Sequence, residues 1–145
     1  MGNRQIGFVL MVLAVWVCAP VGNSGLYAQI GGEKVVKILT IGNSFADNAT
    51  TYLEEMAESV PGYAIEVTRA TIGGSSLEKH ASLIEACEED PSVKPYNDQF
   101  CLHELLIREP YDFVTIQQVS SQSFKPETFE PNAGQIIRFV RELAP

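Results

Sequence analysis

Three short apolar segments, each followed by small polar residues, constrain the fold of this chain most. They are 35–41 (VVKILTI), 64–72 (AIEVTRATI) and 112–117 (DFVTIQ). β-Branched residues dominate them, which is typical of strands that end at a turn. Segments with helical periodicity separate them at 51–60, 77–89 and 98–108, and another follows at 132–143. This order predicts parallel strands joined by right-handed crossovers, hence an α/β fold.

The start of the first helical segment is open to two interpretations. Thr51-Tyr52-Leu53-Glu54 resembles a capping box, which places the helix start at Thr51. A start nearer Asp47 is also compatible with the pattern. Pro61-Gly62 ends the helix in either case.

The first 28 residues have the organisation of a secretory signal peptide. Arg4 gives a positive start, residues 6–17 are almost entirely apolar, and Pro20 then interrupts the run. Such an apolar run is too short to span a bilayer. We expect cleavage after Ala28, secretion or release to the periplasm, and a mature domain of residues 29–145 without membrane attachment. An uncleaved N-terminal anchor is the alternative.

Charge and cysteine content narrow the possible partners. The formal net charge is −8, and no run of Lys or Arg occurs, so nucleic acid is an unfavourable partner. After cleavage two cysteines remain, Cys87 and Cys101, and an exported protein can join such a pair in a disulfide. Two free buried thiols are the alternative. No Cys-x-x-Cys pair is present, so we expect neither a metal nor another cofactor. The sequence gives no indication of oligomeric state.

The segments after the three strands contain residues suited to acyl chemistry. The carboxyl ends of parallel strands meet at one edge of a sheet, where ligands bind. Ser44 follows the first strand, but a serine hydroxyl needs a base and donors for the oxyanion. The backbone N–H of Gly74 can approach a substrate oxygen closely, and a glutamine after the third strand offers an amide donor. Taken singly, a serine before a helix is usually only a cap.

These segments resemble the SGNH (GDSL-type) hydrolase superfamily, and within it a branch of secreted bacterial SGNH-like proteins. The matching motifs are IGNSF at 41–45, IGGSSLEKH at 72–80 and YDFVTIQQVSSQSF at 111–124. The resemblance covers about residues 35–145. It implies a flavodoxin-like three-layer α/β/α sandwich and the hydrolysis of esters, with acetylated carbohydrates as possible substrates.

The resemblance also assigns roles to individual residues. It makes Ser44 the nucleophile, with its own N–H in the oxyanion hole. Gly74 supplies a second donor, and Gly73 is the neighbouring alternative. Gln117 or Gln118 stands where the family usually has an asparagine. Asn43, Gly73 and His80 are possible substrate contacts.

The catalytic base of the family comes from a C-terminal Asp-x-x-His segment, which these 145 residues do not contain. Their histidines are His80 and His103. His80 is predicted near the crevice as a polar helix residue, with a substrate contact or a replacement for the missing base as alternatives. His103 is predicted as a structural residue, with the role of base as a weaker alternative. In the family one or two further strand–helix units follow the last helix. We therefore expect a C-terminally truncated domain with about three strands.

Three hypotheses follow from this pattern. The full-length protein is an SGNH-type serine esterase acting on small-molecule or carbohydrate esters. Alternatively, the same crevice is a non-enzymatic module that binds a carbohydrate or a small anion. A third possibility is that this form is a catalytically inactive fragment.

Overall fold

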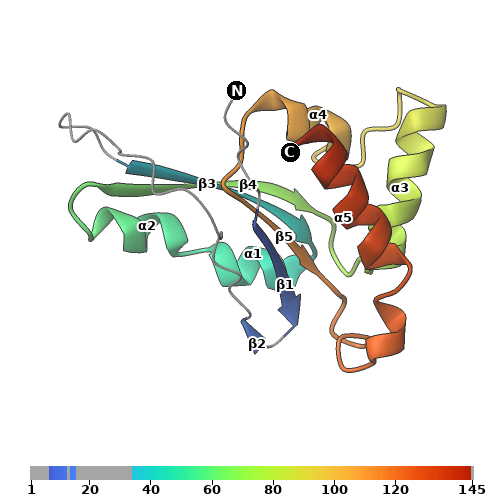
Figure 1. The fold of residues 1–145 in the computed structure, drawn as a ribbon, viewed down its shortest axis with the longest axis horizontal. Coiled ribbons are helices and arrows are strands. Elements are labelled where there is room, and N and C mark those ends of the chain that lie inside the picture. Colours follow the sequence, from blue (N-terminus) through green and yellow to red (C-terminus); the bar gives the residue numbers. More distant parts are fainter. Residues whose placement is uncertain (1–6, 13, 16–33, 145) are drawn as a thin grey trace.

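A five-stranded sheet with helices on both faces organises the chain (Figure 1). The computed structural model describes residues 7–12, 14–15 and 34–144. The strand order is β2-β1-β5-β3-β4, and all neighbours are parallel except β1 and β2. The strands are β1 (Gly7–Val12), β2 (Ala14–Val15), β3 (Lys34–Gly42), β4 (Tyr63–Thr71) and β5 (Phe113–Gln117).

The three predicted strands are confirmed as β3, β4 and β5. In β3, Leu39 lies opposite Thr68 of β4 on one side and Val114 of β5 on the other. The spatial order β4-β3-β5 corresponds to the first three positions of the doubly wound order 2-1-3-4-5. The predicted α/β class with a parallel sheet is therefore confirmed.

The sheet has more strands than the three expected, because β1 lies along the free edge of β5. Residues Gly7–Met11 pair in parallel with Phe113–Gln117. An open strand edge presents unpaired N–H and C=O groups, which an apolar segment can satisfy. Both β1 and β2 fall within the predicted signal peptide, whose cleavage stays a prediction. None of the helices in the described part of the chain has the length and apolar character needed to span a membrane.

Two short helices replace the first predicted helix. They are α1 (Ser44–Thr50) and α2 (Leu53–Glu58). The predicted capping box at Thr51 is wrong: the Thr51 hydroxyl donates to the Asp47 carbonyl, and α2 has no side-chain cap. The start nearer Asp47 was the better interpretation, since the side chain of Asn43 caps α1.

The remaining helices follow the predicted pattern with one difference. They are α3 (Leu77–Glu89), α4 (Leu102–Arg108) and α5 (Asn132–Leu143), with a short 3₁₀ turn η1 (Pro126–Thr128) before α5. The prediction began α4 at Asp98, which is wrong. Asn97 and Asp98 both have φ of 54°, a left-handed conformation that cannot continue into a right-handed helix.

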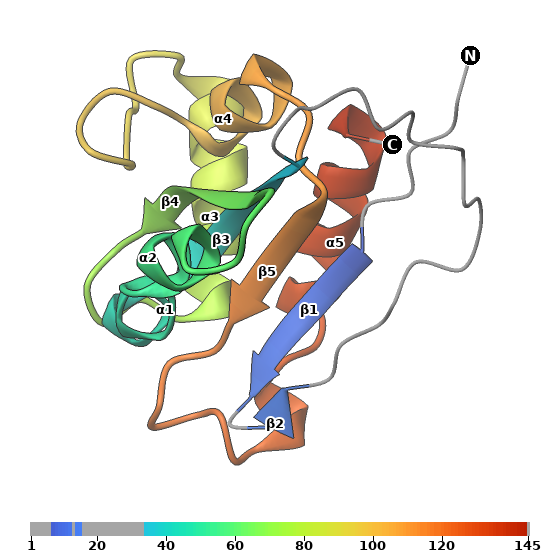
Figure 2. The same cartoon turned by 90° about the vertical axis from the view of Figure 1, so that its left-hand side faces the viewer.

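The hydrophobic core lies between the sheet and the three C-terminal helices. Figures 1 and 2 show α1 and α2 on one face of the sheet, and α3, α4 and α5 on the other. Leu39 and Ile41 of β3 are fully buried and belong to the same core cluster as Ile136 of α5. This packing fixes the directions of the strands, and thereby the place where their carboxyl ends meet.

Candidate functional site

Hydrogen bonds connect the segments that follow β3, β4 and β5. The carbonyl of Gly42 accepts from the Ile72 N–H at 2.9 Å. The Asn43 N–H donates to the side-chain oxygen of Gln117 at 3.3 Å, and the Asn43 side-chain amide donates to the Ser75 carbonyl at 2.9 Å. The structure therefore brings together the three strand ends that the sequence singled out.

Asn43 is the centre of these connections rather than a surface residue. It is 1% exposed, and its side-chain oxygen accepts from the Phe45 N–H at 3.1 Å. Its amide nitrogen is already bonded to Ser75. The sequence suggested that Asn43 contacts a substrate. Because the polar groups of its side chain are engaged within the protein, Asn43 is placed to hold the loop instead.

Ser44 has the opposite environment. Its side chain is exposed, and neither its hydroxyl nor its backbone N–H makes a hydrogen bond to the residues that the structure describes. Phe45, the next residue, is 54% exposed and adds an apolar side chain at the same edge. Ser44 is therefore accessible to a ligand, as a nucleophile must be.

The glycine pair after β4 leaves space on its exposed side. Gly74 has φ of +69°, a backbone conformation that residues other than glycine adopt only with strain. Its N–H makes no hydrogen bond to the described residues, and nothing lies within 4 Å of where a Cβ would stand. Gly73 has the same open surroundings. Both backbone N–H groups remain available to a ligand oxygen.

The two glutamines after β5 differ in what their amide groups can do. Gln118 is 1% exposed; its NH₂ donates to the carbonyl and hydroxyl of Thr128. Its oxygen accepts from the Leu77 and Val119 N–H groups. All of its hydrogen-bonding capacity is used to join α3 to the loop after β5.

Gln117 keeps a free donor. Its oxygen must face Asn43, because a backbone N–H requires an acceptor, so its NH₂ points away. That NH₂ has no partner within the described part of the chain. A Cβ on Gly42 would stand 2.9 Å from the Gln117 oxygen, so glycine at 42 is what allows this approach. Of the two glutamines, Gln117 therefore keeps an amide donor that a ligand could use, whereas Gln118 does not.

His80 is fully buried, not on the polar helix surface that the sequence suggested. Its Nε2 lies 2.9 Å from the Gly42 carbonyl and 2.7 Å from the Ser75 hydroxyl oxygen. Its Nδ1 lies 2.9 Å from the Tyr96 hydroxyl. Burial lowers the pKa of His80 to about 4, so the imidazole is neutral near pH 7. Neither Ser75 nor Tyr96 was singled out from the sequence, since nothing local marks them as partners of His80.

The close contact of Ser75 with His80 resembles a nucleophile and its base, but the surroundings exclude that role. Ser75 is 6% exposed, and its hydroxyl donates to the Gly42 carbonyl at 3.1 Å. Since that carbonyl can only accept, Nε2 must carry the imidazole proton. A protonated nitrogen cannot take the proton of Ser75, so this pair is structural.

The other predicted features lie away from this edge. His103 is exposed on α4, which precedes β5 and lies at the opposite end of the sheet in Figure 2. Within residues 7–12, 14–15 and 34–144, no group of three acidic, histidine or cysteine side chains is arranged to hold a metal ion.

The two cysteines are free thiols in this structure, so the predicted disulfide is not formed here. Burial raises the pKa of the Cys87 thiol to about 11, and Cys101 adds to this shift. The two side chains are therefore neighbours. Cys87 is therefore protonated near neutral pH. Formation of the bond under oxidising conditions stays a prediction.

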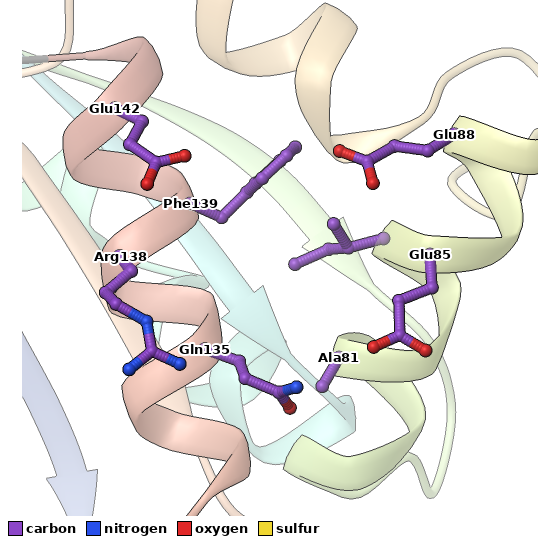
Figure 3. Close-up of a pocket in the computed structure, with 8 residues that line it drawn as sticks. Ala81, Glu85, Glu88, Gln135, Arg138, Phe139 and Glu142 are labelled. Atoms are coloured by element: carbon purple, nitrogen blue, oxygen red, sulfur yellow. The ribbon is translucent and has the colours of Figure 1, made fainter.

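A surface groove runs between α3 and α5, separate from the Ser44 edge (Figure 3). Phe139 of α5 extends toward α3 across this groove. Charged residues of both helices line it: Glu85, Glu88, Arg138 and Glu142. The groove shares no residue with the candidate site.

The fold of the chain is similar to that of a solved structure. A DUF4886 family protein from Bacteroides uniformis has 24% sequence identity and a TM-score of 0.65 to this chain. The similarity covers 77% of this chain and 46% of that protein, so the chain spans less than half of its length. No protein-family model and no curated protein matches the chain. At this identity the similarity establishes a shared α/β fold.

Proposed function

We propose that the chain carries the nucleophile and oxyanion hole of an exported SGNH-type serine hydrolase that acts on esters. One observation carries this proposal. Ser44 is exposed and its hydroxyl makes no hydrogen bond, while the preceding residue, Asn43, is hydrogen-bonded to the segments after β4 and β5, which offer unpaired donors. The donors are the N–H of Ser44, the N–H of Gly74 and the NH₂ of Gln117. The motif resemblance supplies the reaction class, and acetylated carbohydrates are the proposed substrates.

In the proposed reaction the Ser44 oxygen attacks the acyl carbon of the ester. The carbonyl π electrons move onto oxygen, and the three donors stabilise the resulting oxyanion. Collapse of this intermediate expels the alcohol and leaves an acyl group on Ser44. Water then attacks the acyl-enzyme, releasing the acid and restoring the serine.

The mechanism requires a base that takes the Ser44 proton, gives it to the oxygen of the leaving alcohol, and later moves a proton from the attacking water to the Ser44 oxygen. His80 cannot serve, because it is buried with its proton on Nε2, and His103 lies on α4 at the other end of the sheet. The base is therefore proposed to come from outside the described residues. The DUF4886 protein is long enough for such a segment, since this chain covers only 46% of it.

Covalent labelling tests the proposal directly. A fluorophosphonate reacts with activated serines, so the test uses a preparation of the protein that includes the segment proposed to supply the base. The expected product is a single adduct on Ser44, located by peptide mass spectrometry. Ser44→Ala abolishes the adduct. Ser82→Ala is the matched control, because Ser82 is an exposed serine on α3, and it keeps the adduct. An adduct that survives in Ser44→Ala would exclude Ser44 as the nucleophile.

A non-enzymatic binding module is the second candidate, favoured by the lack of a base beside Ser44 in the described part of the chain. The same donors would then hold a carbohydrate or a small anion without reaction. In that case calorimetry with an acetylated xylo-oligosaccharide shows binding that persists in Ser44→Ala. No fluorophosphonate adduct forms on the wild-type protein even when the preparation includes the segment proposed to supply the base. The hydrolase proposal predicts the reverse outcome for the adduct.

A further inference from the structure

The His80 imidazole bonds to two loops of the candidate site at once. Gly42, which accepts from Nε2, lies two residues before Ser44. Ser75, whose hydroxyl oxygen lies 2.7 Å from the same nitrogen, directly follows Gly74. A single fully buried ring therefore contacts residues close to both the proposed nucleophile and the second proposed oxyanion donor.

The partners of His80 determine its protonation. The Gly42 carbonyl has no proton to give, so Nε2–H is the donor there. Nδ1 is then the acceptor, and the Tyr96 hydroxyl donates to it. The single Nε2–H is shared between the Gly42 carbonyl and the Ser75 hydroxyl oxygen, and the Ser75 O–H donates a hydrogen bond to the same carbonyl. With the proton on Nδ1 instead, Nε2 and the Gly42 carbonyl would be two acceptors 2.9 Å apart, and the Tyr96 hydroxyl would have no acceptor among the groups of this cluster.

The surroundings of His80 also oppose a positive charge on the ring. The groups facing it are the hydroxyls of Ser75 and Tyr96 and the carbonyl of Gly42, none of them a carboxylate. Burial is the main cause of the lowered pKa of His80, and the hydrogen bond to the Gly42 carbonyl acts against it. The cation Lys79 lowers the pKa further, because it disfavours a second positive charge. Tyr96 itself is buried, and this burial raises its pKa, so its hydroxyl stays protonated as the donor.

We infer that His80 is a positioning residue of the candidate site: a neutral imidazole, protonated at Nε2, that fixes the loop carrying Ser44 against the loop carrying Gly74. Its effect on catalysis rests on the proposed function, whereas its effect on the geometry of the two loops does not. His80 touches neither Ser44 nor a substrate in this role. It acts through Gly42 and Ser75.

The first test measures the tautomer in the full chain. Nitrogen-15 spectra of the imidazole separate protonated from unprotonated ring nitrogens. The expected result at pH 7 is a protonated Nε2 and an unprotonated Nδ1 for His80. His103→Gln assigns the signals by removing the other histidine. A proton on Nδ1 at pH 7, with or without one on Nε2, would overturn the inference.

The second test asks whether His80 positions the site. His80→Gln keeps an N–H donor within reach of the Gly42 carbonyl, whereas His80→Leu does not. The expected result is a change in the amide chemical shifts of Ser44 and Gly74 in His80→Leu, a smaller change in His80→Gln, and none in the control His103→Gln. Unchanged shifts in a folded His80→Leu would contradict a positioning role. If His80→Leu does not fold, the chemical shifts of Ser44 and Gly74 in His80→Gln and the tautomer of His80 in the wild type test the inference instead. Unchanged shifts in His80→Gln, or a proton on Nδ1 in the wild type, would then contradict it.

Ester hydrolysis gives the third readout, with a preparation in which the wild type is active. Misplacing the oxyanion donors lowers kcat by roughly tenfold to a hundredfold in His80→Leu, with little change in KM. His80→Gln restores part of the loss. If the wild type hydrolyses no ester, the proposed function fails, while the two spectroscopic tests still judge the inference. Equal kcat in an active wild type and a folded His80→Leu would overturn it.

Discussion

The two faces of the sheet are covered to very different depths. On the face of α3, α4 and α5, a continuous core buries Leu39, Val114 and Ile136 completely. On the other face, α1 has 7 residues and α2 has 6, and both Tyr52 and Met56 are 63% exposed. Most of the buried apolar residues belong to the core cluster of the first face, whereas the second face carries Ser44.

This difference shows how an exposed site can be held in place. Ser44 begins a short helix with few packing contacts, so little on its own side fixes it. Its loop is held instead from the better packed side, through Gly42, His80 and Asn43. Accessibility and position thus come from different faces of the sheet, as is common where binding residues lie on loops of a rigid scaffold.

Truncation of Ile136 to alanine is expected to have the largest effect. Ile136 is fully buried at the centre of the α3–α5 face, so Ile136→Ala removes buried methyl groups and leaves a cavity. Such changes cost about 2–5 kcal/mol of unfolding free energy. Urea denaturation followed by circular dichroism measures it. A loss below about 1 kcal/mol would mean that this face is not the main core.

Acidification is expected to destabilise the protein through His80. The native ring has a pKa of about 4, below the 6.5 of an unfolded chain, so between these values only the unfolded state binds the proton. Stability is therefore complete above pH 6.5 and falls as the pH drops toward 4, by up to about 3 kcal/mol. Urea denaturation of the wild type and of His80→Gln at several pH values in this range measures the loss of unfolding free energy. The part of the loss that comes from His80 should be absent in the variant. Parallel curves would contradict the buried neutral state.

Oxidation of Cys87 and Cys101 is expected to stabilise the α3–α4 side. Exchange with oxidised glutathione would join the two sulfurs and release two reduced glutathione molecules. A closed loop of about 15 residues adds roughly 3 kcal/mol in the chain-entropy account. Intact mass shows the loss of two hydrogens, and Cys87→Ala, which cannot form the bond, is the control. Two alkylatable thiols remaining after oxidation would refute the predicted disulfide.

Three of the strands and two of the helices were predictable from the sequence, because their signals are local. β-Branched runs placed β3, β4 and β5, and apolar periodicity placed α3 and α5. The burial of His80 was not predictable, since its partners Gly42 and Tyr96 lie 38 and 16 residues away. The choice between Gln117 and Gln118 likewise depends on which backbone groups each amide meets across the fold.

The glycines of the site should rank by their surroundings. Gly42→Ala would place a Cβ 2.9 Å from the Gln117 oxygen and 3.0 Å from the Ala46 Cβ, at a cost of about 1–3 kcal/mol. Gly74→Ala has space but a φ of +69°, which costs about 1–2 kcal/mol. Gly73→Ala has neither problem and serves as the control. Thermal unfolding of the three variants gives the order, and a Gly73→Ala as damaging as Gly42→Ala would refute it.

Met56→Ala on α2 should have the smallest effect and completes the comparison of the two faces. Its side chain is 63% exposed, so truncation removes little buried surface and leaves no cavity. Such substitutions usually change unfolding free energy by no more than about 0.5 kcal/mol. The same urea titration used for Ile136→Ala measures it. A loss of 2 kcal/mol or more would show that another surface covers α2 in solution, and the face that carries Ser44 would then be better packed than this chain alone indicates.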